Sequence, residues 1–269
     1  MEEPDKRGAE LLAQIEATET TTPTLWWLGH AGFAIKYASL TFYVDPCLST
    51  PRGRARMQPP PLAANEIRNA DLILFTHKHD AHMDAASLGA ILDASPRAKV
   101  VMPKSAAEHA NSLGVPYDRM TTTDSDLRIE FFKDGLYGRV YAVPSAHDRL
   151  EWTPIGGFPY LGYLIRFGSC TIYHPGDCVF YEGIVERLRP YNVSVALLPI
   201  AGKNFSVAEA AQLAEDIRAQ WLVPMHYGTF NGGDEITHFI EHMLGHRPLQ
   251  RFKVFRCGEK WTIPDDSGL

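Results

Sequence analysis

The chain has 269 residues, of which 45% are hydrophobic and 22% charged, values typical of a soluble globular protein with a sizeable core. The formal net charge of −6 disfavours nucleic acid as a partner, because phosphate contacts require clustered Lys and Arg. The one basic cluster, Arg52, Arg54 and Arg56, is interpreted as a solvated loop, with an anionic ligand as the alternative. No apolar run reaches the ~18 residues that cross a bilayer, so we expect no membrane partner.

The start of the chain and its cysteines favour a reducing compartment. The first ten residues, MEEPDKRGAE, are polar and acidic and hold no apolar signal-peptide core, so we expect a cytoplasmic protein. The four cysteines are far apart and show no C-x-x-C spacing, which argues against a structural zinc site or a disulfide framework. They are Cys47, Cys170, Cys178 and Cys257.

The first half of the chain begins with β-rich segments and then alternates strands with helices. Apolar residues at helical spacing, Leu11, Leu12 and Ile15, predict a short amphipathic helix. β-formers separated by short turns then predict three antiparallel strands. A stretch rich in proline and arginine, 49–62, predicts an irregular loop of the kind that often forms a lid. In order, we predict a helix over 8–16, strands over 26–28, 32–37, 40–44 and 71–75, a helix over 84–94, a strand over 99–103 and a helix over 104–113.

The second half again places strands first and alternates strands with helices near its end. No repeat at a solenoid period is visible. Two such halves indicate an α/β (α+β) sandwich, with two mixed sheets packed face to face and helices outside. We expect a single domain over 1–269, in which 1–23 is an N-terminal helical extension. The predicted strands cover 127–132, 138–144, 160–167, 170–174, 193–199, 221–225 and 252–256, and the predicted helices cover 207–218 and roughly 235–244.

The strongest functional signal is THKHDAH, residues 76–82, directly after a predicted buried strand. It places His77, His79 and His82 within six residues. Imidazoles at this density would repel one another when protonated and would need many partners when neutral, whereas a divalent cation accepts neutral imidazole as a ligand. A strand end holds such side chains on a fixed backbone. We therefore predict a metal site; a solvated, histidine-rich loop is the weaker alternative.

Three further residues of ligand type follow predicted strands, each with Pro or Gly nearby. They are His147 in PSAHD, Asp177 in HPGD and His226 in PMHYGT. Four strand ends that carry such residues are hard to explain without one shared cation centre. Five histidines and one aspartate form a borderline ligand set, which suits zinc, manganese or iron better than a thiolate-binding metal. The sequence thus predicts one or two divalent ions.

Seven short segments, in a fixed order, resemble a known family. They are WWLGHAGF, VDP, THKHDAHMD, SAHD, YHPGD, LLPI and PMHYGTF. With them the chain resembles the metallo-β-lactamase superfamily over roughly residues 24–262, and within it the branch of L-ascorbate-6-phosphate lactonases and similar metal-dependent hydrolases. The resemblance implies an αββα sandwich with metals at one edge of its sheets. It also implies zinc, or manganese as in the lactonase branch.

The resemblance further implies the ligands of two metals. His77, His79 and His147 would hold the first, His82 and His226 would hold the second, and Asp177 would bridge the two. The family motif is H-x-H-x-D-H, and Ala81 stands where its aspartate should be, while Asp80 is one residue early. The loss of an anionic ligand weakens the second site more than the first. We therefore expect one metal to bind firmly and the second to be weak, absent or different.

A bound cation can lower the pKa of water to about 7. We predict attack by metal-bound hydroxide on a small, phosphorylated lactone or ester, with Asp177 holding the metals and orienting the nucleophile. Asp84 is a second catalytic candidate as a partner for a histidine N–H, or else an N-terminal helix residue. A metal-dependent phosphodiesterase is the alternative enzyme. A non-catalytic metal- or ligand-binding member is the third hypothesis, which Ala81 favours.

Three further side chains near these motifs are candidates for contact with the substrate or the reacting atoms. His30, in LGHAGF, and His174, in YHPGD, either face the site or are structural histidines with satisfied nitrogens. Tyr227, directly after His226, either donates to an oxyanion as a catalytic residue or packs in the core.

The expected partner is a small anionic substrate. Lys203 could bind its phosphate as a point charge, with Asn204 beside it, and Arg149 is a second cationic candidate. Each of these charges taken alone is more often a surface charge. The sequence leaves open whether copies of the chain associate as a homo-oligomer.

Overall fold

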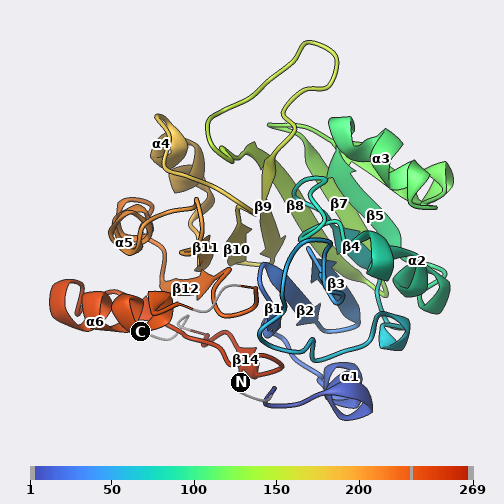
Figure 1. The fold of residues 1–269 in the computed structure, drawn as a ribbon, viewed down its shortest axis with the longest axis horizontal. Coiled ribbons are helices and arrows are strands. Elements are labelled where there is room, and N and C mark those ends of the chain that lie inside the picture. Colours follow the sequence, from blue (N-terminus) through green and yellow to red (C-terminus); the bar gives the residue numbers. More distant parts are fainter. Residues whose placement is uncertain (1–3, 231–232, 266–269) are drawn as a thin grey trace.

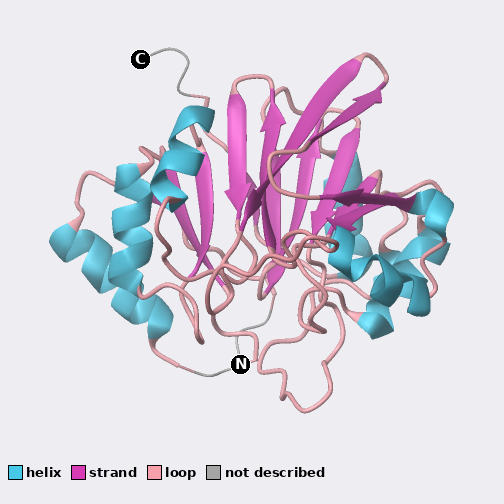
Figure 2. Ribbon diagram, turned by 90° about the horizontal axis from the view of Figure 1, so that it is seen from above, coloured by secondary structure: helices cyan, strands magenta, loops and turns pink. Residues whose placement is uncertain are grey.

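Two seven-stranded sheets pack face to face at the centre of the protein, and helices cover both outer sides (Figures 1 and 2). This arrangement, in a computed structural model that describes residues 4–230 and 233–265, confirms the predicted α/β sandwich of two mixed sheets. The prediction of one domain over 1–269 with an extension over 1–23 includes residues 1–3, 231–232 and 266–269, which lie outside the described residues.

The first sheet comes from the β-rich start of the chain and has the order β14-β1-β2-β3-β4-β5-β6. Its antiparallel part confirms the three predicted strands, and consists of β1 (Thr24–Gly29), β2 (Gly32–Tyr37) and β3 (Leu40–Val44). Its parallel part consists of β4 (Leu72–Leu74), β5 (Lys99–Pro103) and β6 (Met120–Thr123). The short strand β14 (Lys260–Thr262) pairs antiparallel with β1. The sequence did not predict β6 or β14, which lack a run of buried apolar residues.

The second sheet has the order β13-β12-β11-β10-β9-β8-β7. Its antiparallel part consists of β7 (Arg128–Lys133), β8 (Leu136–Pro144), β9 (Leu161–Phe167) and β10 (Cys170–His174). Its parallel part consists of β11 (Val195–Pro199), β12 (Trp221–Met225) and β13 (Arg251–Phe252). The predicted strand over 252–256 is wrong beyond Phe252, because Phe255 leaves the sheet and packs in the core.

The helices divide between the two outer sides. Beside the first sheet lie α1 (Gly8–Ala17), α2 (Ala85–Ala94) and α3 (Ala107–Ser112), and beside the second lie α4 (Ile184–Leu188), α5 (Val207–Asp216) and α6 (Glu235–His246) (Figure 1). The predicted helix 104–113 starts as a 3-10 turn over Lys104–Ala106, and α4 was not predicted. Further 3-10 turns cover Ala64–Glu66, Tyr117–Arg119 and Arg189–Tyr191. In the described parts of the chain, no helix is both long and apolar enough to cross a membrane.

Two hydrophobic clusters hold these layers together. The larger lies between the sheets and includes Trp27, Phe33 and Phe167. The second lies between the first sheet and its helices, and there α1 buries the predicted apolar face of Leu11, Leu12 and Ile15. The helix α1 is therefore packed into the fold.

The strand directions bring several strand ends to one edge. β3 and β4 are parallel, and β1 is antiparallel to β2, which is antiparallel to β3, so β1, β3 and β4 all end at the same edge of the first sheet. In the second sheet β10, β11 and β12 are parallel and also end together. β8 runs in the same direction as β10, because both are antiparallel to β9, and the segments after β4, β8, β10 and β12 carry the predicted metal ligands.

Candidate metal centre

The structure brings all six predicted metal ligands into one cluster. His77, His79 and His82 lie in the turns after β4, and His82 N–H donates to His79 O over 2.9 Å, which folds this segment back on itself. The remaining ligands follow β8, β10 and β12. Ligand nitrogens of His77, His79 and His147 lie within 4.8 Å of one another, so this first group could hold one ion.

Asp177 lies between this first group and a second group, which consists of His82 and His226. Its Oδ2 is 3.5 Å from Nε2 of His147, in the first group. Its Oδ1 is 3.3 Å from Nε2 of His82 and 2.9 Å from Nε2 of His226. One carboxylate therefore offers one oxygen to each side, which is the arrangement that a bridging ligand needs.

The chemistry of these side chains fits a divalent cation. Nε2 of His77 is buried and forms no hydrogen bond within the described structure, whereas Nε2 of His82 and Nε2 of His226 face the carboxylate of Asp177. An unsatisfied buried polar group costs roughly 1–3 kcal/mol. A divalent cation bound by imidazole nitrogens gathered around a carboxylate would remove this cost.

Asp45, which was not among the predicted site residues, orients His82. It is fully buried at the end of β3, and its Oδ2 lies 2.8 Å from Nδ1 of His82. A carboxylate only accepts hydrogen bonds, so Nδ1 of His82 donates to Asp45, and Nε2 is the nitrogen that the ring presents to a metal. The clue in the sequence was VDP, in which Asp45 follows a strand in the same way as the predicted ligands.

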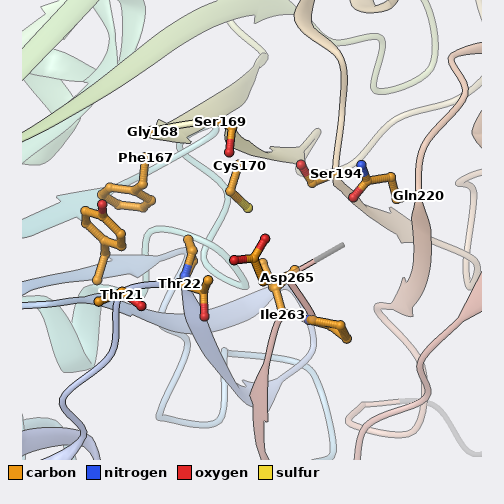
Figure 3. A pocket seen from close by; sticks show the side chains of 13 residues that line it. Thr21, Thr22, Phe167, Gly168, Ser169, Cys170, Ser194, Gln220, Ile263 and Asp265 are labelled. Carbon is orange, nitrogen blue, oxygen red and sulfur yellow. The ribbon is translucent and has the colours of Figure 1, made fainter. Parts of the chain in front are cut away.

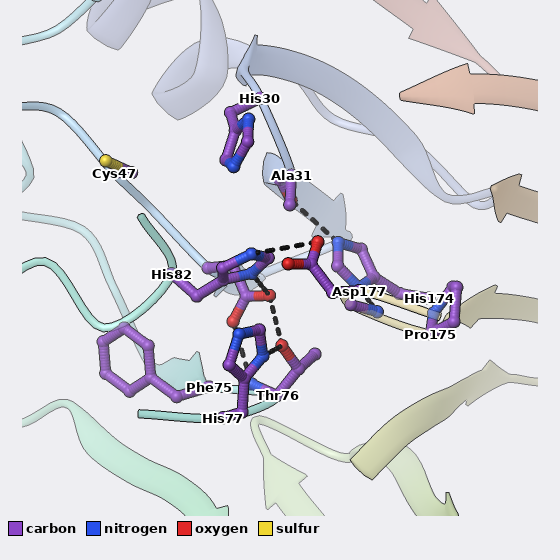
Figure 4. Close-up of polar contacts among 12 residues, drawn as sticks. His30, Ala31, Cys47, Phe75, Thr76, His77, His82, His174, Pro175 and Asp177 are labelled. Carbon is purple, nitrogen blue, oxygen red and sulfur yellow. Dashed lines mark hydrogen bonds and ion pairs between the residues drawn. The ribbon is translucent and has the colours of Figure 1, made fainter. Parts of the chain in front are cut away.

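Through Thr76 the same carboxylate also sets the tautomer of His77, and Figure 4 shows the contact between Thr76 and His77. The Thr76 hydroxyl donates to Oδ2 of Asp45 over 2.6 Å, and the Thr76 N–H donates to Oδ1 over 2.8 Å. Because its only proton is used there, Thr76 Oγ1 accepts from Nδ1 of His77, 3.1 Å away. Nε2 of His77 is then also free to bind a metal.

Burial and neighbouring charges lower the pKa of some of these histidines and raise that of another. Burial and the nearby His82 hold the pKa of His77 well below its usual value, and burial with His147 lowers the pKa of His79, so both rings are neutral. Burial also opposes a charge on His82, but the carboxylates of Asp177 and Asp45 outweigh it and raise the pKa of His82 to about 10. A metal at Nε2 of His82 would displace that proton.

Gly176 allows the loop that carries Asp177 to approach β4 closely. A Cβ atom at this position would lie 2.4 Å from Oγ1 of Thr76, and the backbone adopts the left-handed region at φ +69°. Glycine is the residue that tolerates both constraints. The HPGD segment thus crosses the end of β4 and delivers Asp177 to the histidines.

A cavity of about 420 Å³ opens beside the cluster and is lined by His147, Asp177 and His226. Arg54 and Lys203 line it as well, so its rim is cationic. Arg54 belongs to the predicted irregular loop 49–62, which therefore reaches the cavity. Figure 3 shows a different pocket, of about 390 Å³, at the start of β10. It lies at the opposite edge of the sheet, and no histidine lines it.

Two predicted site residues have structural roles instead. Asp84 is buried and caps α2 by accepting from Ala86 N–H; it also accepts from Ser49 and Ser87. The prediction that it partners a histidine is therefore wrong, because these donors use its carboxylate. Tyr227 packs in the core, as the alternative interpretation of this residue predicted. Its ring centroid lies 4.7 Å from that of Trp27, and its hydroxyl donates to Phe255 O.

The structure gives different roles to His174 and His30, the two histidines predicted either to face the site or to be structural. His174 is fully buried, its Nε2 donates to Ala31 O over 2.7 Å, and its Nδ1 accepts from Gly176 N–H (Figure 4). Its expected contact with substrate is therefore wrong. His30 faces the cluster, with its ring centroid 3.7 Å from that of His226.

The candidates for binding an anion also differ from one another. Lys203 is exposed at the cavity, 4.0 Å from Asp148. Asn204 lines the cavity but also joins two loops, since its side chain accepts from Cys178 N–H and donates to Ala201 O. Arg149 is exposed and is not among the residues that line the cavity, so the structure does not support its predicted contact.

Sequence reasoning also missed an aromatic side chain beside the first group. The ring centroid of Tyr160 lies 5.0 Å from that of His147 and 5.3 Å from that of His77. Burial raises the pKa of Tyr160, so its hydroxyl keeps its proton. Its position just before β9 resembles an ordinary apolar strand residue, which gave no signal of a role.

Comparison with known proteins agrees with this geometry. Residues 24–226 match the model of the β-lactamase superfamily domain. A relative from Myxococcus xanthus (strain DK1622), named UPF0173 metal-dependent hydrolase, is 33% identical over 224 residues, which cover 81% of this chain and 75% of the relative. The chain belongs to the UPF0173 family of the metallo-β-lactamase superfamily.

Solved structures show that this UPF0173 protein shares its fold with metallohydrolases. Igni18, a metallo hydrolase from Ignicoccus hospitalis KIN4/I, has a TM-score of 0.71 at 21% identity, covering 91% of this chain and 100% of that chain. An isothiocyanate hydrolase from Delia radicum gut bacteria has a TM-score of 0.70 at 18% identity, covering 89% of this chain and 98% of that chain. Likeness at these identities supports the fold alone.

Proposed function

We propose that this UPF0173 protein is a metal-dependent hydrolase of a small, anionic ester or lactone, with a phosphorylated lactone as the first candidate. The observation that carries the proposal is one carboxylate, Asp177, set between two groups of histidines beside a cationic cavity. A divalent cation bound there would lower the pKa of water and polarise a carbonyl or phosphoryl oxygen. The nitrogen and oxygen ligand set suits zinc or manganese, and is compatible with iron.

The residues of the chain prepare the centre for this chemistry. Asp45 and Thr76 engage Nδ1 of His82 and Nδ1 of His77, so Nε2 is the nitrogen that each ring presents to a metal. Asp177 links the two groups through its two oxygens, and so sets their separation. Ligands held in advance lose little conformational freedom when a metal binds.

The cavity supports an anionic small molecule as the substrate. Its volume of about 420 Å³ is within the ordinary range for small-molecule sites. The guanidinium of Arg54 and the ammonium of Lys203 stand where they would attract a phosphate or carboxylate group.

Hydrogen bonds fix the loop 49–62 beside the site. Arg56 donates to the carbonyl oxygens of Cys47, Ser49 and Gln58. Met57 N–H donates to Thr229 O over 2.7 Å, which ties the loop to the segment after β12. A loop fixed in this way would limit the access of bulk water to a bound substrate.

Turnover by the metal-loaded protein tests the function. The protein is stripped of metal, reloaded with zinc or manganese, and assayed on phosphorylated and plain lactones, carboxylic esters and phosphodiesters. We expect hydrolysis of a lactone or ester, lost in Asp177→Ala and after chelation. Turnover of phosphodiesters alone would assign a phosphodiesterase instead. If neither the loaded protein nor its Ala81→Asp variant turned over any of them, a non-catalytic binding role would replace the proposal.

A further inference from the structure

His30 lies in the turn between β1 and β2, at the sheet edge where the metal ligands gather. Its ligand nitrogen and those of His82 and His226 all lie within 4.8 Å of one another. In Figure 4 the His30 ring stands over His82 and Asp177, and no dashed contact reaches it. By position, His30 belongs to the second group of ligands.

The His30 ring forms no hydrogen bond with the rest of the described structure. It is 2% exposed, and both of its ring nitrogens lack a partner. His174, equally buried, uses both of its nitrogens. An imidazole with an unused ring nitrogen can offer that nitrogen to a metal. A structural histidine would have satisfied these atoms.

The backbone of His30 is held firmly in an unfavourable conformation. Its φ is +52°, and that of His226 is +74°, both in the left-handed region that side chains avoid. The His30 N–H donates to Thr229 Oγ1 over 2.7 Å, and the His30 carbonyl accepts from His226 N–H over 2.9 Å. Strain maintained in this way is typical of functional sites. These bonds tie the two histidines to each other and aim both rings inward.

Within the described parts of the chain, the groups of possible metal ligands that contain His82 include no carboxylate other than Asp177. Ala81, Cys47 and Phe230 form a small buried apolar cluster. The Phe230 ring meets that of His30 edge-on, with centroids 4.8 Å apart. An apolar cluster therefore occupies the place from which the family aspartate would reach the second metal, and His30 stands at its border.

We propose that His30 is the third histidine ligand of the second metal. It takes the place of the family aspartate, at whose position this chain has Ala81. The second metal is then held by His30, His82 and His226 and shares Asp177 with the first metal. This assignment rests on the metal-dependent function proposed above. Each metal has three imidazoles and one oxygen of a shared carboxylate. With one negative charge fewer than the family pattern, the centre favours an anionic substrate.

Zinc binding by matched variants tests this assignment. His30→Asn keeps a residue that tolerates the left-handed backbone but shortens the side chain. We expect two zinc ions per wild-type chain by metal analysis and titration calorimetry. In His30→Asn, one ion stays tight and the second binds at least about tenfold more weakly. The same substitution at exposed His238 is the control and leaves both ions in place. His30→Asn combined with Ala81→Asp restores the second ion.

The ring nitrogens of His30 provide a readout that does not depend on a variant's folding. Their ¹⁵N resonances are expected to shift in the wild-type protein during titration with zinc. Two ions bound equally well by His30→Asn, or no shift at His30 in a wild-type protein that binds two, would overturn the role of His30 and leave the hydrolase proposal standing. A wild-type protein that binds no metal would overturn both.

Discussion

The carboxylate of Asp45 lies 2.8 Å from Nδ1 of His82, although 37 positions separate the two residues in the chain. Through Thr76 the same carboxylate also reaches His77, so one fully buried aspartate sets the tautomer of a ligand in each group. The segment after β3 is thus as much a part of the metal centre as the histidine motif after β4. Three predictions test this picture of the site, and a fourth tests the burial of the cysteines.

Removing the charge of Asp45 should weaken metal binding. In Asp45→Asn, the amide N–H₂ can donate to Nδ1 of His82, which moves the ring proton to Nε2, where the metal binds. We expect zinc affinity to fall about 10- to 100-fold, measured by competition with a chelator. Asp84→Asn is the matched control: it replaces one acceptor oxygen of a buried carboxylate with an amide donor that faces other donors, so it should lower the melting temperature while the zinc affinity stays unchanged. Equal affinity in Asp45→Asn and the wild type would contradict the role of Asp45.

Removal of metal should lower thermal stability without unfolding the protein. A ligand at 100 times its dissociation constant stabilises the folded state by about 2.7 kcal/mol, which in a protein of this size corresponds to about 5–10 °C in Tm. Both hydrophobic clusters are independent of the metal ligands, so the secondary structure should persist. Circular dichroism melting curves with and without chelator, followed by zinc addition, measure the effect. An unchanged Tm would argue against a metal bound to the folded state.

Arg54 and Lys203 should act on substrate binding rather than on the metal. Once a substrate is known, Arg54→Ala and Lys203→Ala are each expected to raise KM on the order of tenfold, with a smaller change in kcat and unchanged metal content. Arg52→Ala is the control, because Arg52 belongs to the same loop but does not line the cavity. If Arg52→Ala raised KM as much as Arg54→Ala, a general charge effect would replace the specific contact.

The cysteines should be unreactive in the folded protein. Burial raises the pKa of Cys47 to about 12 and that of Cys178 to about 11. A raised pKa leaves the thiol protonated at pH 8, where a group of pKa 11 is ionised in only about one molecule in a thousand, and the thiolate is the reactive form. Alkylation by iodoacetamide, followed by mass spectrometry, should therefore be slow until guanidinium unfolds the chain. Rapid labelling of either cysteine in the native protein would contradict this environment.

Much of the fold could be predicted because its signals are local. Runs of buried apolar residues, such as those of β1 and β11, can be read from the sequence, and so can the apolar spacing of α1. Two short strands, β6 and β14, could not be predicted, since their few residues gain most of their stability from pairing with distant partners. The end of β13 at Phe252 likewise depends on Phe255 packing into the core.

The sequence by itself determined which residues could bind a metal, because imidazole and carboxylate groups after strand ends point to that chemistry wherever the strands lie. Only the tertiary structure decided what each of these groups contacts. Asp84 became a helix cap and Asp45 the partner of His82; His174 became a satisfied core residue and His30 a ring with two free nitrogens. These pairs share residue types and motif surroundings. They differ in partners supplied by strands and loops far away in the chain, which sheet direction and register bring together.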